Sequence, residues 1–208
     1  MSFQEYLRFT VTLVAVLDPF FAVPIFLMLT ATSGPDARRR LIHAVTIAVF
    51  LILAAAALFG EPLLKLMGAS LPAFRVGGGL VLLLMALAML NAEVGKVRQN
   101  PAEAEELRSG DLSGVVPLAV PLLAGPGAIS TTIIAAQAGG ALHTGLLIAC
   151  IAFVCLLLFA MLRLAEPIGA RMGTTGLNIA TRLLGLLLAA ISIEMMAQGL
   201  RELFPGLT

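Results

Sequence analysis

The chain has 208 residues, of which 60% are hydrophobic and only 12% are charged, and its mean hydropathy is +1.03. A soluble domain carries about 25% charged residues, so this composition excludes a water-soluble surface, and it is also too hydrophobic for intrinsic disorder. The formal net charge of +1 argues against a nucleic-acid partner, and a single tyrosine with no tryptophan argues against an aromatic-girdled outer-membrane barrel. An all-α transmembrane protein remains, with the lipid bilayer as its partner.

Six apolar segments predict transmembrane helices, because about 20 apolar residues are needed to cross the hydrocarbon core of a bilayer. In chain order they are approximately 9–31, 41–59, 72–90, 112–138, 144–162 and 179–200. Asp18-Pro19 interrupts the first segment, and Gly125-Pro126-Gly127 interrupts the fourth. Proline removes a backbone donor and glycine relaxes a helix, so the first and fourth helices are expected to be broken.

Local signals predict where other helices end and how the chain is divided. Gly60-Glu61-Pro62 is expected to end the second helix, and Glu166-Pro167 is expected to end the fifth. Gly77-Gly78-Gly79 is expected to let another helix approach closely. The polar stretch 91–111 is expected to be a surface loop, so that residues 1–208 form a single membrane domain. No small-residue cleavage site precedes the first break, so a removable signal peptide is not expected.

The basic residues are unevenly distributed between the two sides of the predicted helices. Nine lie after the first, third and fifth helices: Arg38, Arg39, Arg40, Lys96, Arg98, Arg108, Arg163, Arg171 and Arg182. Four lie on the other side: Arg8, Lys65, Arg75 and Arg201. The positive-inside rule then predicts a bacterial inner-membrane protein whose loops after spans 1, 3 and 5 are cytoplasmic and whose termini are both outside.

The sequence repeats itself at about half its length. Glu61-Pro62 and Met67-Gly68 recur 105 residues later as Glu166-Pro167 and Met172-Gly173. Arg75-x-x-Gly78 recurs 107 residues later as Arg182-x-x-Gly185, and Asp18-Pro19 aligns with Gly125-Pro126 at the same offset. Each half, about 1–95 and 110–208, holds three predicted spans, and an odd number makes the second half enter from the opposite side. The pattern predicts two inverted three-helix repeats, a transporter architecture in which interrupted helices mark the binding site.

The two breaks supply candidate binding groups for a small zwitterionic solute. A half-helix N-terminus favours a carboxylate, and a half-helix C-terminus favours a cation such as an ammonium group. Asp18 has two compatible interpretations: a partner for a substrate ammonium or coupling ion, or a cap on the half-helix that follows Pro19. Ser130 and Thr131 could donate to a substrate carboxylate or bond back to their own helix. The expected substrate-binding residues are Asp18, Pro19, Phe20, Phe21, Ala22, Gly125, Pro126, Gly127, Ser130 and Thr131.

Three other charged residues fall within or near the predicted spans. Arg75 and Arg182 match across the repeat, and each could pair with a carboxylate or extend to the membrane interface. Glu194 lies about 18 Å along the helix from Arg182, at a rise of about 1.5 Å per residue. It is therefore either a proton or cation site inside the membrane or a glutamate near the outer interface.

Enzymatic and metal chemistry have little support in the sequence. His43 and His143 stand singly, with no carboxylate or cysteine at ligand spacing, and no catalytic motif of a hydrolase or metalloprotease is present. No resident metal or cofactor is expected, apart from a coupling Na⁺ or H⁺.

Several motifs resemble the MarC family of bacterial inner-membrane proteins. They are LDPFFAVPIF (17–26), PLLAGPGAIST (121–131), EPLLKLMG and RVGGGLVLL, and the resemblance covers essentially the whole chain. The family was named for a proposed link to multiple antibiotic resistance. The sequence is also similar to the SnatA-type small neutral amino-acid transporters. The resemblance implies six spans, inverted repeats with broken first and fourth helices, and cation-coupled transport of glycine or alanine.

The sequence departs from the family pattern at two places. The first motif of the family usually reads Asp-Pro-x-Gly-Asn-x-Pro, whereas Phe21 and Ala22 replace the Gly-Asn pair here, and Glu194 stands where glutamine is commoner. Loss of the asparagine contact would suit a bulkier, more apolar substrate, or no amino-acid transport at all. The leading hypothesis is a secondary transporter of a small neutral amino acid. The alternatives are a drug or metabolite exporter of the same fold and a non-transporting membrane protein that scaffolds or senses stress.

Overall fold

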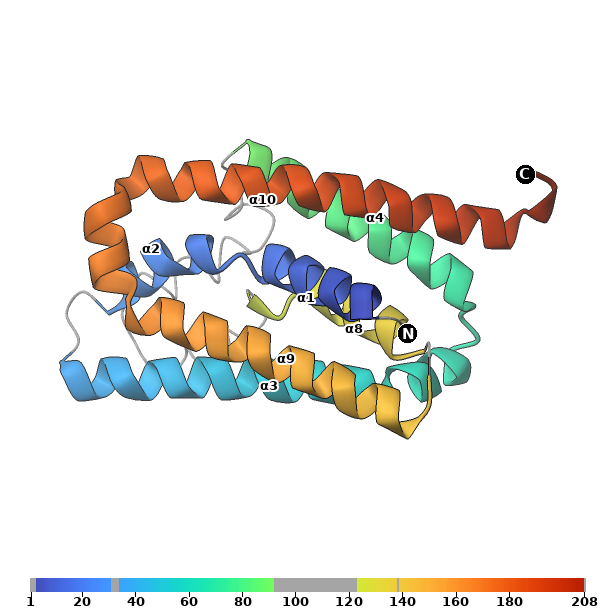
Figure 1. Cartoon of the computed structure of the whole chain (residues 1–208), viewed down its shortest axis with the longest axis horizontal. Coiled ribbons are helices and arrows are strands. Elements are labelled where there is room, and N and C mark those ends of the chain that lie inside the picture. Colours follow the sequence, from blue (N-terminus) through green and yellow to red (C-terminus); the bar gives the residue numbers. More distant parts are fainter. Residues whose placement is uncertain (1–2, 31–33, 92–122, 138, 208) are drawn as a thin grey trace.

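The computed structural model describes residues 3–30, 34–91, 123–137 and 139–207, which are helical apart from short connections (Figure 1). The polar stretch predicted to be a loop, 91–111, lies almost wholly outside these residues. The elements are α1 (Phe3–Leu17), α2 (Pro19–Leu29), α3 (Pro35–Leu66), α4 (Leu71–Leu90), α8 (Pro126–Ala136), α9 (Ala141–Arg163), α10 (Ala165–Leu203) and the short 3₁₀ helix η1 (Pro205–Leu207).

The apolar helices are long enough for a membrane protein. Five helical stretches within the described residues have the length and composition to cross a bilayer: Phe3–Leu27, Pro35–Leu66, Leu71–Leu90, Ala141–Arg163 and Ala165–Leu203. The segment predicted as the fourth span, about 112–138, falls mostly outside the described residues, and its described part forms the eleven-residue helix α8. The all-helical class is therefore confirmed for the described residues, and the apolar helices are compatible with a membrane protein.

Two proline signals act differently from the prediction. α3 continues through Pro62 to Leu66, so the expectation that Gly60-Glu61-Pro62 ends this helix is wrong. Pro62 and Leu58 are both exposed, so the proline ring and the carbonyl that it leaves unbonded lie on an outer face of the last turns. α9 ends at Arg163, and Pro167 lies in the first turn of α10, where its missing N–H has no intrahelical partner anyway.

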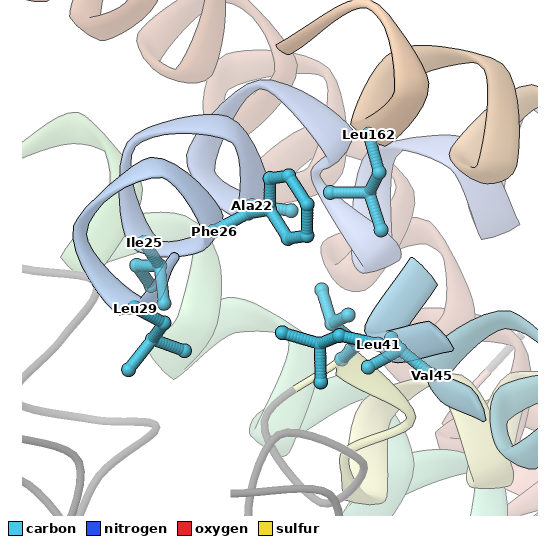
Figure 2. A pocket seen from close by; sticks show the side chains of 8 residues that line it. Ala22, Ile25, Phe26, Leu29, Leu41, Val45 and Leu162 are labelled. Carbon is cyan, nitrogen blue, oxygen red and sulfur yellow. The ribbon is translucent and has the colours of Figure 1, made fainter. Parts of the chain in front are cut away.

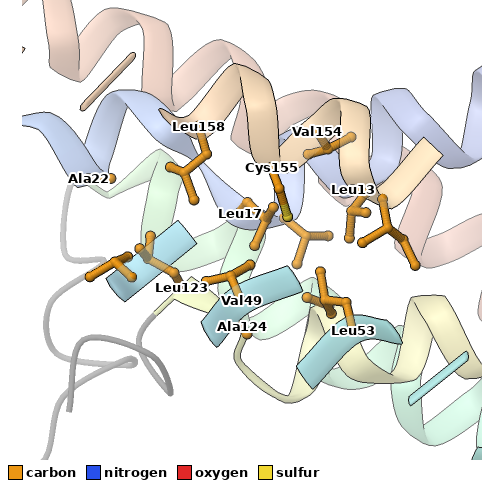
Figure 3. Packing of buried hydrophobic residues seen from close by; sticks show 14 of the residues in the cluster. Leu13, Leu17, Ala22, Val49, Leu53, Leu123, Ala124, Val154, Cys155 and Leu158 are labelled. Carbon is orange, nitrogen blue, oxygen red and sulfur yellow. The ribbon is translucent and has the colours of Figure 1, made fainter. Parts of the chain in front are cut away.

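The helices pack in three layers (Figure 1). α4 and α10 run antiparallel on one side, α3 and α9 run antiparallel on the other, and α1, α2 and α8 lie between them. Figure 3 shows the core between the middle layer and the α3–α9 layer, where Leu13 and Leu17 of α1 meet Leu53 of α3 and Leu158 of α9. The sandwich therefore buries most of α8, whereas α2 is partly buried.

The α4–α10 pair is held at close distance by glycines. A Cβ atom on Gly79 would lie 2.5 Å from Met196 Cγ, and one on Gly199 would lie 2.7 Å from the carbonyl oxygen of Pro72. The predicted close approach is thus confirmed for Gly78 and Gly79, whereas a Cβ on Gly77 would meet nothing within 4 Å. Small residues drive such packing in membranes because they let helix backbones make extensive van der Waals contact.

Several of the described basic residues lie near helix ends. Arg38, Arg39 and Arg40 begin α3, at the end where α9 finishes with Arg163 and α10 begins. The first turns of α1, the last turn of α3 and the C-terminus of α10 lie at the opposite end.

Candidate functional site

The first helix break is a buried turn centred on Asp18. This residue is 0% exposed and has φ of +45°, in the left-handed region that aspartate tolerates better than most residues. Its Oδ1 accepts hydrogen bonds from the Phe21 amide at 3.2 Å and from the Thr181 hydroxyl of α10 at 3.4 Å. Asp18 therefore caps α2, with Pro19 at the first helical position, and also joins the break to α10.

The second break precedes α8. Gly125 occupies the N-cap position with no side-chain cap, and Pro126 follows as the first helical residue. A Cβ on Gly127 would lie 2.8 Å from Leu82 Cδ2 and from Met85 Sδ, and 3.4 Å from Val16 Cγ1. Gly127 is thus packed against α4 and against α1 two residues before Asp18, so the fold brings the two breaks together.

The hydroxyl groups after the second break are turned onto their own helix. Ser130 and Thr131 both donate to the Gly127 carbonyl oxygen, at 3.1 and 2.8 Å. Thr132 donates to the Ala128 carbonyl at 2.8 Å. Their protons are used inside α8, whereas their oxygens keep lone pairs that can still accept.

The apolar residues of the first motif face the core rather than a polar cavity. Phe20 and Phe21 are half-buried against the hydrophobic core. Ala22 and Phe26 of α2 line an apolar pocket of about 30 Å³ together with Leu41 and Leu162 (Figure 2). A space of this size holds about one water molecule and no amino acid. Phe21 and Ala22, which stand where the resemblance predicts Gly-Asn, thus leave the chain after Asp18 apolar.

A larger cavity of about 630 Å³ lies between α1, α8, α10 and the start of α4, and we call it the N-terminal vestibule. Its polar lining residues are Gln4, Glu5, Arg8, Thr12, Arg75, Thr131, Glu194 and Gln198, and its apolar lining includes Phe9, Ile134, Ile191 and Met195. Thr131 is one helical turn from Gly127, so the vestibule extends from the N-terminal end of α1 towards the second break.

Two of the predicted charged residues, Glu194 and Arg75, line this vestibule, and each pairs with a different residue. Glu194 accepts from Arg8 at 3.3 Å and from Gln198 at 3.4 Å, and the Arg8 and Glu194 side chains are 69% and 55% exposed. Arg75 lines the same cavity and pairs with Glu202. By contrast, Arg182 is exposed and forms no ion pair with the described residues, and Asp18 is not among the vestibule residues.

Sequence reasoning missed a partly buried polar pair beside the vestibule. Tyr6 Oη lies 2.7 Å from His143 Nδ1, and His143 Nε2 lies 2.8 Å from the carbonyl oxygen of Ala135, near the end of α8. A carbonyl only accepts, so Nε2 donates, and the Nδ1 of a neutral ring accepts from the tyrosine. The available signal was that Tyr6 is the single tyrosine of the chain. Within the described residues, no group of three or more His, Cys, Asp or Glu side chains could hold a metal ion.

Comparison with known proteins gives one consistent relationship. A family model described as "MarC family integral membrane protein" matches residues 3–204. The UPF0056 membrane protein YhcE of Escherichia coli is 35% identical, over 99% of this chain and 96% of its own. YvbG of Bacillus subtilis is 35% identical over the full length of both chains, and a UPF0056 membrane protein of Methanocaldococcus jannaschii is 37% identical over 97% and 98%. No solved structure matches. Because both the family model and these relatives cover nearly the whole chain, the protein belongs to the MarC family of integral membrane proteins.

Proposed function

We propose that the protein is a secondary transporter of a small neutral amino acid of the glycine or alanine class, working by alternating access. The observation that carries the proposal is the pair of buried helix breaks, at Asp18 and Gly125, which pack beside each other. Backbone interrupted at membrane depth is tolerated where protein or a water-filled cavity satisfies it, and transporters place their substrates at such sites.

An inverted repeat is supported by the correspondence of the elements. α2 and α8 each have eleven residues and begin at prolines 107 positions apart, Pro19 and Pro126. Gly68 and Gly173, which match in the sequence repeat, both adopt positive φ, at 69° and 61°. In Figure 1, α2 and α8 run in opposite directions, as do α4 and the long C-terminal part of α10. These relations favour two halves that can rock about the breaks.

We assign the solute site to the region of the two breaks, which the vestibule approaches at Thr131. The uncapped N-terminus of α8 favours a carboxylate, and the Asp18 carboxylate favours an ammonium group. Gly125 and Gly127 would supply backbone, and the hydroxyl oxygens of Ser130 and Thr131 would accept from the solute. Glu194 is the candidate for a coupling proton or Na⁺, because it lies in the vestibule and keeps acceptor capacity beside Arg8.

The direction of access follows from the charge distribution. The arginine-rich ends of α3 and α9 would face the cytoplasm of a bacterial inner membrane under the positive-inside rule. The N-terminal vestibule, at the opposite end, would then open to the outside. Glu5, Arg8 and Glu194 would be among the charged groups that a zwitterion meets on entry.

A metabolite or drug exporter of the same fold is the second candidate. It is favoured by one observation, the wholly apolar lining around Ala22, where the family usually has an asparagine. An exporter would accept bulkier, less polar solutes at this position. A Phe21→Gly/Ala22→Asn variant distinguishes the two candidates. If the protein is an amino-acid transporter, the variant should carry glycine faster than the wild type. If the protein is an exporter, the variant should export apolar solutes more slowly.

The test is uptake of labelled glycine, alanine and serine into proteoliposomes, with and without Na⁺ or proton gradients. Gly127→Leu should abolish saturable flux, because the side chain would collide with Leu82, Met85 and Val16. Gly77→Leu is the matched control, since a Cβ there meets nothing within 4 Å. Absence of saturable flux in the wild-type protein under every gradient would refute amino-acid transport. If Gly127→Leu and Asp18→Ala both leave the cellular phenotype intact, the protein is a scaffold or stress sensor instead.

A further inference from the structure

A basic hollow lies where the start of α3 meets the end of α9, far from the N-terminal vestibule (Figure 1). Its volume is about 410 Å³, and its lining includes Arg38, Arg39, Ile42, Phe159, Arg163 and Glu166. A neighbouring hollow of about 520 Å³ is lined by Asp36, Arg39, Arg40 and His43. Four arginines therefore face two carboxylates, which leaves the region net positive.

The arginines of the basic hollow differ in whether they pair with other residues of the protein. Arg38 is committed to the protein, because it pairs with Glu166 and donates to the carbonyl oxygen of Thr30 at 3.0 Å. Arg39 and Arg163 are exposed and form no ion pair with any residue that the structure describes. Their guanidinium groups lie on two different helices that pack together, so both can reach one anion between them.

An apolar stripe continues from the hollow along both helices. On α3, His43, Ile47 and Leu51 follow one another at one-turn spacing, and the last two are 56% and 58% exposed. On α9, Leu156 lies one turn before Phe159 and is 64% exposed. The twelve residue steps from Arg39 to Leu51 span about 18 Å at about 1.5 Å per step. One leaflet contributes about 15 Å of hydrocarbon, so the stripe has the length of an acyl chain.

We propose that the basic hollow binds the phosphodiester headgroup of an anionic phospholipid, with its acyl chains along the α3–α9 stripe. Guanidinium groups bind phosphate oxygens in bidentate fashion, and Arg39 and Arg163 supply two of them. Basic pockets between membrane helices are suited to anionic headgroups. A lipid is assigned rather than free phosphate because the cationic groups and the exposed apolar stripe are continuous. The inference rests on membrane-family membership and not on the transport activity.

The test is lipid titration of the purified full-length protein in detergent, with native mass spectrometry to obtain the dissociation constant and circular dichroism to follow thermal unfolding. Phosphatidylglycerol should bind with saturation and raise the unfolding temperature, whereas phosphatidylcholine and inorganic phosphate should not. Each arginine near an anionic headgroup contributes about 1 kcal/mol, about fivefold in affinity. Arg39→Gln/Arg163→Gln should therefore weaken phosphatidylglycerol binding by about 25-fold.

Arg171→Gln/Arg201→Gln is the matched control, because it removes the same charge from exposed positions of α10 outside the hollow. This control should bind phosphatidylglycerol as the wild type does. Equal weakening in both double variants would overturn the proposal in favour of general surface attraction, and equal protection by inorganic phosphate would overturn it in favour of a soluble-anion site. If the first double variant does not fold, Arg39→Lys and Arg39→Gln decide. Lysine keeps the charge and should lose less affinity than glutamine, which should lose about fivefold, and equal affinity in the two would overturn the proposal.

Discussion

Replacing Gly199 by alanine would place a methyl group where α4 already lies. The new Cβ would be 2.7 Å from the Pro72 carbonyl oxygen, 2.8 Å from Val76 Cγ2 and 3.1 Å from Arg75 Cβ. The Pro72 oxygen is backbone in the first turn of α4, so no rotamer change can remove it. The two helices must separate locally, which would also disturb the pairing of Arg75 with Glu202.

The size of the effect follows from two opposing terms. Alanine is favoured over glycine in a helix by about 1 kcal/mol, and forcing a methyl group into a packed contact costs about 1–3 kcal/mol. Gly77→Ala is the matched control, because Gly77 lies in α4 and a Cβ there meets nothing within 4 Å. Gly77→Ala should be stabilised by up to about 1 kcal/mol, and Gly199→Ala should be less stable than this control by about 1–3 kcal/mol.

The assay is unfolding by sodium dodecyl sulfate in mixed micelles, followed by circular dichroism, with the wild type and both variants measured together. The difference between the two alanine variants cancels the common helix-propensity gain and reports packing between α4 and α10. Equal unfolding free energies, or a Gly199→Ala protein more stable than Gly77→Ala, would show that the two helices do not pack this closely.

Three further predictions concern the other buried polar and sulfur groups. Asp18→Ala should destabilise the protein by about 1–3 kcal/mol, because it removes the α2 cap and places alanine in a left-handed backbone conformation. Asp18→Asn should be about as stable as the wild type, because asparagine also caps helices and tolerates positive φ. Thermal unfolding of both variants distinguishes these outcomes, and equal losses of stability would exclude the capping role. Tyr6→Phe should cost about 0.5–1.5 kcal/mol by removing the hydrogen bond to His143, and an unchanged unfolding free energy would mean that the bond is not formed. N-ethylmaleimide in mild detergent should label the partly exposed Cys150 faster than the buried Cys155, as tested with single Cys→Ser variants; faster reaction of Cys155 would contradict the packing of α9.

The helix breaks could be predicted from the sequence because their causes are local. Asp18-Pro19 and Gly125-Pro126 change the backbone hydrogen bonds of their own segments, whatever the rest of the chain does. Pro62 shows the limit of this reasoning. The same residue type sits inside α3, because its ring faces outward near the end of a long helix and the lost hydrogen bond is tolerated there.

The partners of the candidate site could not be predicted. Arg8 meets Glu194, Tyr6 meets His143, and Thr181 meets Asp18, across 186, 137 and 163 positions of the sequence. Each pairing depends on which helices become neighbours and on how each is rotated about its axis. No spacing along a single helix contains that information.

The sequence by itself determined that the helices of this protein suit a lipid bilayer, and it determined where those helices break. Hydropathy averaged over about 20 residues measures transfer into lipid, and proline acts on the backbone beside it, so both are read locally. The tertiary structure alone decided that the breaks at Asp18 and Gly127 lie together, that Glu194 is paired with Arg8 in a vestibule, and that Arg38 is committed to Glu166. The tertiary structure also leaves Arg39 and Arg163 exposed. These outcomes depend on close packing between helices distant in sequence, which glycine contacts such as that of Gly199 with Pro72 set at the scale of a single methyl group.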